Sequence, residues 1–167
     1  MKKNLVLIGL SGCGKTTIGK ILAQKLSMSF VDMDEYIEQK EGKTVSQIFS
    51  DHGEAYFRQA ETSSAKTLSE TGGKMIATGG GVVLKRENME YLKQNGVILF
   101  LDRTPEEILQ KIDVEVRPLL AQDKNRLFVL DRERRPLYEA YADLTVRGCP
   151  DIAQTVKNAM EAISPLL

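Results

Sequence analysis

The sequence predicts an α/β fold in which a parallel sheet is covered by helices on both faces. Short apolar runs alternate along the 167 residues with stretches of helical periodicity, and most of these runs are continuous. Continuous apolar runs are typical of strands buried on both faces, and their alternation with helices is typical of a parallel sheet. A third observation is the glycine-rich turn Gly9–Thr16, which joins the first run to the first helix.

The N-terminal half is expected to hold three strands and the helices between them. The helices are recognised from apolar residues three and four positions apart, and their ends from glycine or polar residues. In chain order the expected elements are a strand over Asn4–Ile8, a helix over Thr17–Leu26, a strand over Ser29–Val31, a helix over Glu35–Lys40 ending at Gly42, helix over 45–71 with a break near Gly53, and a strand over Lys74–Ala77.

The C-terminal half is expected to add two strands. A helix start is expected at Thr104, which would be the N-cap, with Pro105 as the first helical residue. Glu107 would be the third helical residue and would complete a capping box. In chain order the expected elements are a helix over Lys85–Gln94 closed by Gly96, a strand over Val97–Leu101, a helix from Pro105, a helix over Asp123–Ala142 interrupted near Pro136, a strand over Leu144–Val146 and a helix over Ile152–Ile163.

Gly9–Thr16 reads G-x-x-x-x-G-K-T, the pattern of a loop that wraps the phosphates of a nucleotide. Its glycines allow a tight turn with N–H groups aimed inward, and the following helix N-terminus favours negative charge. Lys15 would reach the β- and γ-phosphates, and the Thr16 hydroxyl would hold Mg²⁺. The sequence therefore predicts ATP or GTP binding through Gly12, Cys13, Gly14, Lys15, Thr16 and Thr17.

Two carboxylates follow the second strand. Asp32 and Asp34 have period-two spacing, which would place both side chains on one side of a strand end. One carboxylate would hold Mg²⁺, and the other would orient or deprotonate an attacking hydroxyl. The alternative is a polar strand end whose aspartate caps the next helix. Because ligands of parallel sheets bind at the carboxyl ends of strands, the functional interpretation is favoured.

Three arginines are candidates for binding anions. Arg58 and Glu61 are i, i+3 neighbours on a helix, a spacing that by itself indicates an ordinary surface ion pair. Arg117 lies between two helices, and Arg134 precedes Pro136. Arginine binds carboxylates with two parallel hydrogen bonds, and it stabilises charge on a transferring phosphoryl group.

The composition excludes several classes of protein. Lys+Arg and Asp+Glu both number 23, so no basic excess attracts nucleic acid or a membrane surface. No apolar run approaches the roughly 20 residues of a membrane span. Two cysteines cannot build a disulfide framework, which favours a cytoplasmic location. The single histidine, His52, is expected at the surface, and the length predicts one domain over 1–167.

Taken together, these motifs resemble the shikimate kinases over nearly the whole chain. The matching segments are Gly9–Thr16, Asp32-Met33-Asp34, Phe57-Arg58-Gln59-Ala60-Glu61, Ile76–Val83, Arg117-Pro118-Leu119-Leu120, and Arg134 before Pro136-Leu137-Tyr138. The resemblance implies a three-layer fold like that of nucleoside-monophosphate kinases, with five parallel strands in the order 2-3-1-4-5. It also implies transfer of a phosphoryl group from ATP, with Mg²⁺, to the 3-hydroxyl of shikimate by a monomer.

The resemblance implies a role for each matching residue. Catalysis would fall to Lys15, Asp34 and Arg117, with Lys15 and Arg117 contacting the transferring phosphoryl group. Mg²⁺ would be held at Thr16 and Asp32. The substrate would contact Asp34, Arg58, Gly79, Gly80, Gly81 and Arg134, with its carboxylate on the two arginines. A helical region over 34–61 would bind the substrate, between Phe49 and Phe57 as apolar walls, and a lid over 112–125 would carry Arg117.

The chain departs from the family pattern around the base of the nucleotide. Gln110-Lys111 stands where family members often carry an arginine over adenine, and the loop Arg147–Pro150 is short. Recognition of the base, and the choice between ATP and GTP, therefore stay open. The rival interpretations are another small-molecule kinase such as a gluconate kinase, a nucleotide switch protein, which would need the absent N-K-x-D motif, and an inactive scaffold.

Overall fold

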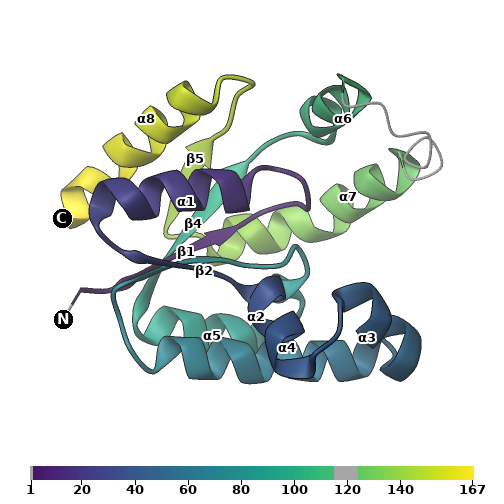
Figure 1. Ribbon diagram of the computed structural model, residues 1–167. Helices are drawn as coiled ribbons and strands as arrows, with labels where there is room; N and C mark the ends of the chain where they lie inside the picture. The colour runs from purple at the N-terminus through teal and green to yellow at the C-terminus, as the bar shows by residue number, and fades with distance from the viewer. Residues whose placement is uncertain (1, 115–123) are drawn as a thin grey trace.

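The computed structural model describes residues 2–114 and 124–167. Within these residues five strands form one sheet in the order β2-β3-β1-β4-β5, and every neighbouring pair is parallel (Figure 1). The strands are β1 (Asn4–Ile8), β2 (Ser29–Asp32), β3 (Lys74–Ala77), β4 (Gly96–Asp102) and β5 (Leu144–Arg147). The predicted α/β class and strand order are both confirmed.

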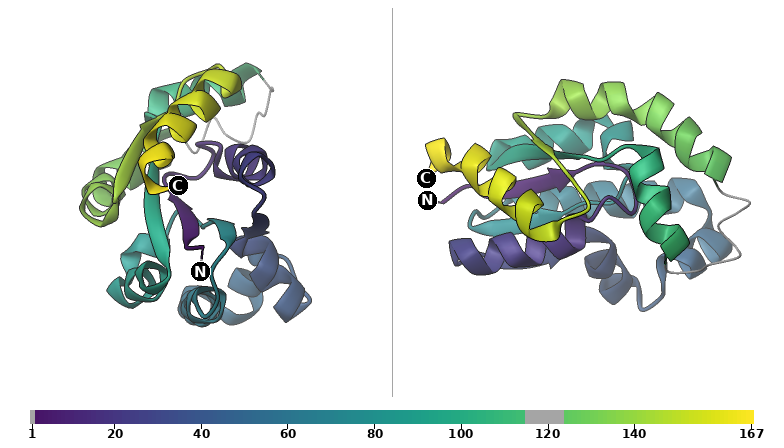
Figure 2. Two further views of the ribbon diagram at one scale, coloured as in Figure 1. Left: turned by 90° about the vertical axis from the view of Figure 1, so that its left-hand side faces the viewer. Right: turned by 90° about the horizontal axis from the view of Figure 1, so that it is seen from above.

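Helices cover both faces of the sheet. Figure 2 shows α1 and α8 on one face and α5 and α7 on the other, with α4 packed beside α5. The helices are α1 (Lys15–Leu26), α2 (Met33–Glu41), α3 (Val45–His52), α4 (Glu54–Ser69), α5 (Arg86–Gln94), α6 (Pro105–Val114), α7 (Lys124–Tyr141) and α8 (Ile152–Ile163), with 3₁₀ turns η1 (Val82–Leu84) and η3 (Ser164–Leu166).

The main core lies on both sides of the central strands β1 and β4. All five residues of β1 are buried, and β4 contributes Ile98, Leu99 and Phe100 to the same cluster. This two-sided burial is the physical reason for the continuous apolar runs in the sequence. The described helices contain none long and apolar enough to cross a membrane.

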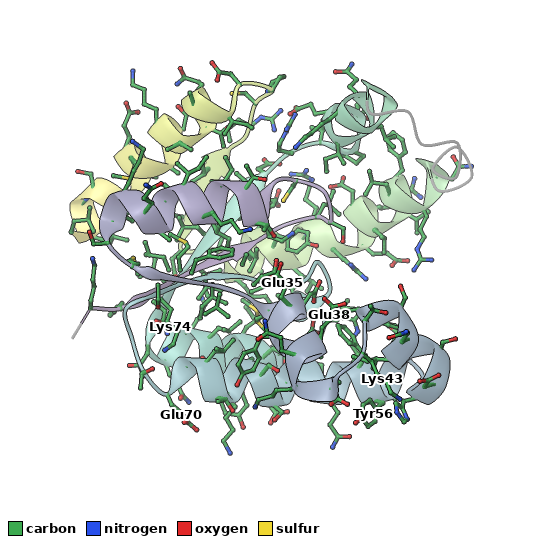
Figure 3. The ribbon with its side chains drawn as sticks, viewed as in Figure 1. Glu35, Glu38, Lys43, Tyr56, Glu70 and Lys74 are labelled. Carbon is green, nitrogen blue, oxygen red and sulfur yellow. The ribbon has the colours of Figure 1, made fainter. Side chains whose placement is uncertain are left out.

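A second, smaller core holds α2, α3 and α4 together at the carboxyl end of the sheet. Ile37, Ile48 and Phe57 are buried in it, and the rings of Phe49 and Phe57 lie 4.8 Å apart between centroids. The Glu38 carboxylate accepts a hydrogen bond from the Val45 N–H at 2.9 Å, which joins α2 to the start of α3 (Figure 3). Both chain termini lie at the opposite end of the molecule (Figure 1).

The boundaries of three elements differ from expectation. α1 begins at Lys15 rather than Thr17, because Gly14 serves as its N-cap. Asp32 is the last residue of β2 and the N-cap of α2, so Asp34 lies in a helical turn. The expected strand-like alternation of these two aspartates is therefore wrong, although both residues line the same cleft, as expected. The predicted break at Gly53 is confirmed, since α3 ends at His52 and α4 begins at Glu54.

Pro136 lies inside α7 without interrupting it, contrary to expectation. A proline removes one helical hydrogen bond, and here the fully buried Tyr138, two residues further on, packs the helix against the core. Gly96 does not close α5, whose C-cap is Asn95; it begins β4, where a Cβ would lie 2.4 Å from the Leu92 carbonyl oxygen. The close approach of two backbones therefore explains this glycine.

The predicted capping box at Thr104 is formed on one side. The Glu107 N–H donates to Thr104 Oγ1 at 3.3 Å. The Glu107 carboxylate, however, accepts hydrogen bonds from Arg103 and Arg147. Two guanidinium groups compete for this carboxylate more effectively than a backbone N–H, because charged donors make the stronger hydrogen bonds.

Candidate active site

A cleft of about 330 Å³ opens at the carboxyl ends of β1, β2 and β3. Three separate segments form most of its walls, namely the glycine-rich loop, the end of β2 and the glycine triplet after β3, and α6 contributes Lys111. The lining residues are Ser11, Gly12, Gly14, Lys15, Thr16, Thr17, Asp32, Asp34, Thr78, Gly79, Gly80 and Lys111. Nine of these were predicted as site residues; Ser11, Thr78 and Lys111 were not, because single polar residues carry no distinctive spacing.

The glycine-rich loop has the backbone that its sequence predicts. Gly14 adopts a φ of 101°, in the left-handed region, and a Cβ on Gly9 would lie 2.7 Å from the Leu101 carbonyl oxygen. Lys15 is buried, and its Nζ donates to the carbonyl oxygens of Gly9 at 2.6 Å and Leu10 at 2.9 Å. The loop therefore holds the ammonium group at the base of the cleft by backbone contacts.

Cys13 occupies the centre of the loop. Its side chain is buried, and its backbone N–H donates to the Leu10 carbonyl oxygen at 3.1 Å. The thiol lies 3.7 Å from Lys15 Nζ. These contacts fix the loop from within, and a contact between Cys13 and a nucleotide stays a prediction.

Asp32 connects the end of β2 to the first turn of α1. Its Oδ2 accepts a hydrogen bond from Thr16 Oγ1 at 2.7 Å, and its Oδ1 accepts from the Glu35 N–H at 3.1 Å. Asp32 therefore caps α2, as one interpretation of the sequence predicts, and also lies in the cleft beside Thr16, as the other predicts. A hydroxyl and a carboxylate that are 16 positions apart in sequence meet at the floor of the cleft.

Asp34 faces the glycine triplet. A Cβ on Gly79 would lie 3.0 Å from Asp34 Oδ1, so the carboxylate rests against the backbone of that glycine. Burial raises the pKa of Asp34, the negative charge of Asp32 raises it further, and the Lys15 ammonium opposes both. A raised pKa makes this carboxylate a better proton acceptor than an ordinary aspartate.

Arg58 and Glu61 form a largely buried ion pair, with Glu61 buried and Arg58 partly buried, rather than the surface pair that their spacing indicates. Arg58 Nη1 lies 3.1 Å from Glu61 Oε1, and the Glu61 side chain is 1% exposed. Burial raises the pKa of Glu61, and the Arg58 guanidinium opposes that rise. On its other side Arg58 meets the glycine triplet, where a Cβ on Gly81 would lie 2.6 Å from Arg58 Nη2.

Arg134 approaches the same triplet from α7. A Cβ on Gly80 would lie 2.8 Å from Ser11 Oγ and 3.3 Å from Arg134 Nη1, so the guanidinium lies close to the backbone of this glycine. Among the described residues, the buried Arg134 Nε has no hydrogen-bond partner. Buried donors of this kind are nearly always satisfied, which indicates an acceptor supplied by a ligand. Arg58 and Arg134 thus approach the triplet from α4 and α7 and bring two guanidinium groups to the backbone of the same loop.

Arg117 and most of the predicted lid lie outside the described residues. Among the described residues, a small hollow beside the glycine-rich loop is lined by Cys13, Gly14, Thr17, Ile18, Arg103, Lys111, Cys149, Ile152 and Thr155. Arg103 is buried, and its Nε lies 3.2 Å from Glu107 Oε2. The sequence interpretation missed Arg103, because its place beside the loop depends on how β4 and α8 pack.

The strand order, the phosphate-binding loop and the acidic end of β2 define a P-loop kinase with a nucleoside-monophosphate-kinase-like fold. The family model described as shikimate kinase matches residues 11–164. The chain belongs to the shikimate kinase family.

Curated relatives carry the same family name. The chain is 40% identical to a shikimate kinase of Clostridium beijerinckii over 163 residues, covering 98% of this chain and 96% of the relative. It is 48% identical to one of Clostridium botulinum strain Eklund 17B over 139 residues, covering 83% of this chain and 84% of the relative.

Solved structures agree with this assignment. A shikimate kinase from Acinetobacter baumannii in complex with shikimate matches with a TM-score of 0.88 and 35% identity, over 100% of this chain and 96% of that one. A gluconokinase from Sinorhizobium meliloti matches with a TM-score of 0.66 and 15% identity over 98% of this chain and 93% of that one, a likeness of fold alone.

Proposed function

We propose that the protein transfers the γ-phosphoryl group of ATP to the 3-hydroxyl of shikimate, giving shikimate 3-phosphate and ADP. The observation that carries this proposal is the approach of Arg58 and Arg134 to the glycine triplet beside Asp34. Shikimate has one carboxylate and three hydroxyls on a small ring. Two guanidinium groups complement the carboxylate, and an aspartate complements a hydroxyl.

The substrate would lie against Gly79, Gly80 and Gly81 with its carboxylate between the two arginines. The unpartnered Arg134 Nε supports this, since a carboxylate oxygen would satisfy it. Asp34 would then accept the hydrogen bond, and finally the proton, of the attacking hydroxyl. Its raised pKa supports the role of proton acceptor. The helical region over 34–61, with Phe49 and Phe57 packed together, would form the apolar wall.

The nucleotide phosphates would bind along the glycine-rich loop and the start of α1. Lys15 lies within the loop and is held by two backbone carbonyls, which phosphate oxygens would replace as its partners. By its family position, Arg117 would add a second cation at the transferring group. Transfer of this kind depends mainly on positioning and charge stabilisation, since the protein forms no covalent bond to the phosphoryl group.

The donor set at the floor of the cleft fits Mg²⁺. Thr16 Oγ1 and Asp32 Oδ2 are adjacent oxygens, and Mg²⁺ in kinases binds through one or two such groups together with phosphate oxygens and water. Bound there, the ion would neutralise charge on the β- and γ-phosphates. Asp32 is already oriented for this role by its hydrogen bond from the Glu35 N–H.

The molecular setting is also part of the proposal. Both cysteines are free thiols, which supports a reducing, cytoplasmic compartment. By resemblance to the family, the protein would act as a monomer. Size-exclusion chromatography with light scattering would test this state, and a dimer at assay concentration would contradict it.

A coupled assay of ADP release tests the function directly. The protein is supplied with MgATP and, in separate arms, shikimate, gluconate or a nucleoside monophosphate. ADP release is expected only in the arm that contains shikimate. Lys15→Ala protein purified in parallel controls for contaminating kinases. Equal turnover with gluconate, or none with shikimate, would overturn the assignment.

A further inference from the structure

The middle carbonyl of the glycine triplet is held by a side chain from α7. Tyr138 Oη donates to the Gly80 carbonyl oxygen at 2.6 Å, and Tyr138 is fully buried. Its ring packs against Phe100 of β4, with 5.2 Å between centroids. Burial raises the pKa of Tyr138, so the hydroxyl stays protonated as a donor.

The other carbonyls of the triplet are held differently. The Gly79 carbonyl accepts from the Val82 N–H, and the Gly81 carbonyl accepts from the Leu84 N–H. Beyond the triplet, Asn88 Nδ2 donates to the Val82 carbonyl oxygen at 3.0 Å. Within the described residues, Gly80 is therefore the one member of the triplet whose carbonyl is held by a side chain.

This hydrogen bond also sets the direction of an N–H group. No peptide bond in the described chain is cis, so the Gly80 carbonyl and the Gly81 N–H point in opposite directions across their shared peptide plane. Because the carbonyl is turned toward Tyr138, the Gly81 N–H is turned away from α7. Gly81 is a buried residue, and no hydrogen bond from its N–H is found among the described residues. An unpaired buried donor indicates an acceptor that arrives with a ligand.

We propose that Tyr138 is a positioning residue for the acceptor substrate, a role that rests on the proposed function. By holding the Gly80 carbonyl, it presents the Gly81 N–H to an oxygen of the anion bound between Arg58 and Arg134. Arg134 and Tyr138 are i, i+4 neighbours on α7, so one helix positions both a guanidinium and the loop peptide.

The substitution Tyr138→Phe tests this role, because it removes one oxygen and keeps the buried ring. The expected result is shikimate binding weakened about 3- to 10-fold, the range for one lost hydrogen bond, with MgADP affinity unchanged. In turnover assays KM for shikimate rises by the same factor and kcat changes little. Calorimetry at a temperature well below the unfolding midpoint of the variant measures its affinities for shikimate and for MgADP.

Two control variants separate an effect on the position of the loop from a general loss of stability. Tyr91→Phe deletes another tyrosine hydroxyl, whose partner is Glu87 on the surface of α5 at 3.2 Å, and should leave both affinities unchanged. Ile163→Val loosens the core at the end of α8, beside Leu5 and Val97 near the starts of β1 and β4, whereas the triplet follows the end of β3; it should lower stability alone. Equal shikimate binding by Tyr138→Phe and wild type, or equal losses for shikimate and MgADP, would overturn the proposal.

A measurement on the unliganded protein keeps this proposal separate from the function itself. Should wild-type protein fail to bind shikimate, the proposed function fails. Backbone amide NMR spectra of the unliganded wild type and variants still test whether Tyr138 orders the loop. The Gly81 amide resonance is expected to shift or broaden in Tyr138→Phe and to stay in place in Tyr91→Phe. An unchanged Gly81 resonance in Tyr138→Phe would show that the tyrosine does not order the loop.

Discussion

Arg58 and Glu61 lie one helical turn apart on α4, with Nη1 and Oε1 3.1 Å apart and the glutamate side chain 1% exposed. Burying two charges is unfavourable unless they are paired, so each holds the other in place. Because Glu61 occupies one edge of the guanidinium, Arg58 is kept against Gly81 before any ligand arrives. The pair therefore fixes the guanidinium beside the glycine triplet.

Arg58→Ala should weaken shikimate binding about 10- to 150-fold, the effect of losing a charge-assisted hydrogen bond worth roughly 1.5–3 kcal/mol. It should also destabilise the fold, because Glu61 is left buried without its partner. MgADP affinity should not change. Calorimetry with each ligand measures the first and third effects, and thermal unfolding measures the second.

The double variant Arg58→Ala, Glu61→Gln provides the control. Removing the unpaired charge should restore part of the stability without restoring shikimate affinity. Unchanged affinity in the single variant would mean that Arg58 acts only as the partner of Glu61.

Lys15→Ala should reduce turnover to less than about a tenth of wild type, since groups that stabilise transition-state charge contribute at least that much. The fold should remain intact, because the contacts of Lys15 Nζ to Gly9 and Leu10 lie within the loop itself. Steady-state rates and circular dichroism test both parts. Lys25→Ala, an exposed lysine on the same helix, is the matched control and should behave as wild type.

Asp34→Asn should slow the chemical step by about 100-fold or more, because an amide cannot accept the proton of the hydroxyl. Nucleotide binding should be little affected. Single-turnover rates measured beside MgADP affinity separate the two effects. A rate close to wild type would reduce Asp34 to a structural residue.

The same variant should be more stable than wild type at neutral pH. Burial and Asp32 raise the pKa of Asp34 in the folded protein, so folding disfavours the ionised carboxylate. The stability linked to this group is present below its unfolded pKa, about 3.9, and is lost as pH rises through the folded value. Asparagine does not ionise, so its advantage should appear at pH 7 and shrink toward pH 4. Unfolding midpoints across this range measure it.

Gly81→Ala should displace Arg58 and weaken shikimate binding, since a new Cβ would lie 2.6 Å from Arg58 Nη2. The guanidinium is the flexible end of its side chain, so stability should fall less than affinity. Gly42→Ala is the contrasting case: its Cβ meets nothing within 4 Å, but its φ of 66° is strained for alanine. It should cost stability and leave affinity unchanged. Calorimetry and thermal unfolding on both variants provide the comparison.

Much of the fold is determined by short-range pattern. Continuous apolar runs identify β1, β3 and β4, because a strand buried on both faces has no polar side. The glycine-rich loop is recognised for a similar reason: a tight turn around phosphates tolerates few other residues at its fixed positions. The break at Gly53 and the start of α6 follow from local backbone chemistry as well.

Only the tertiary structure decided how these residues meet. Nothing in the spacing of Arg58 and Glu61 separates a surface pair from a buried one, because burial depends on how α5 and the glycine triplet pack against α4. The contact from Tyr138 to Gly80 joins residues 58 positions apart, and the role of Asp32 as both cap and partner of Thr16 depends on where α1 lies. Sequence pattern indicates the secondary structure that residues near one another in the chain prefer. Desolvation and long-range hydrogen bonds belong to the assembled fold, and they turned separate motifs into one site.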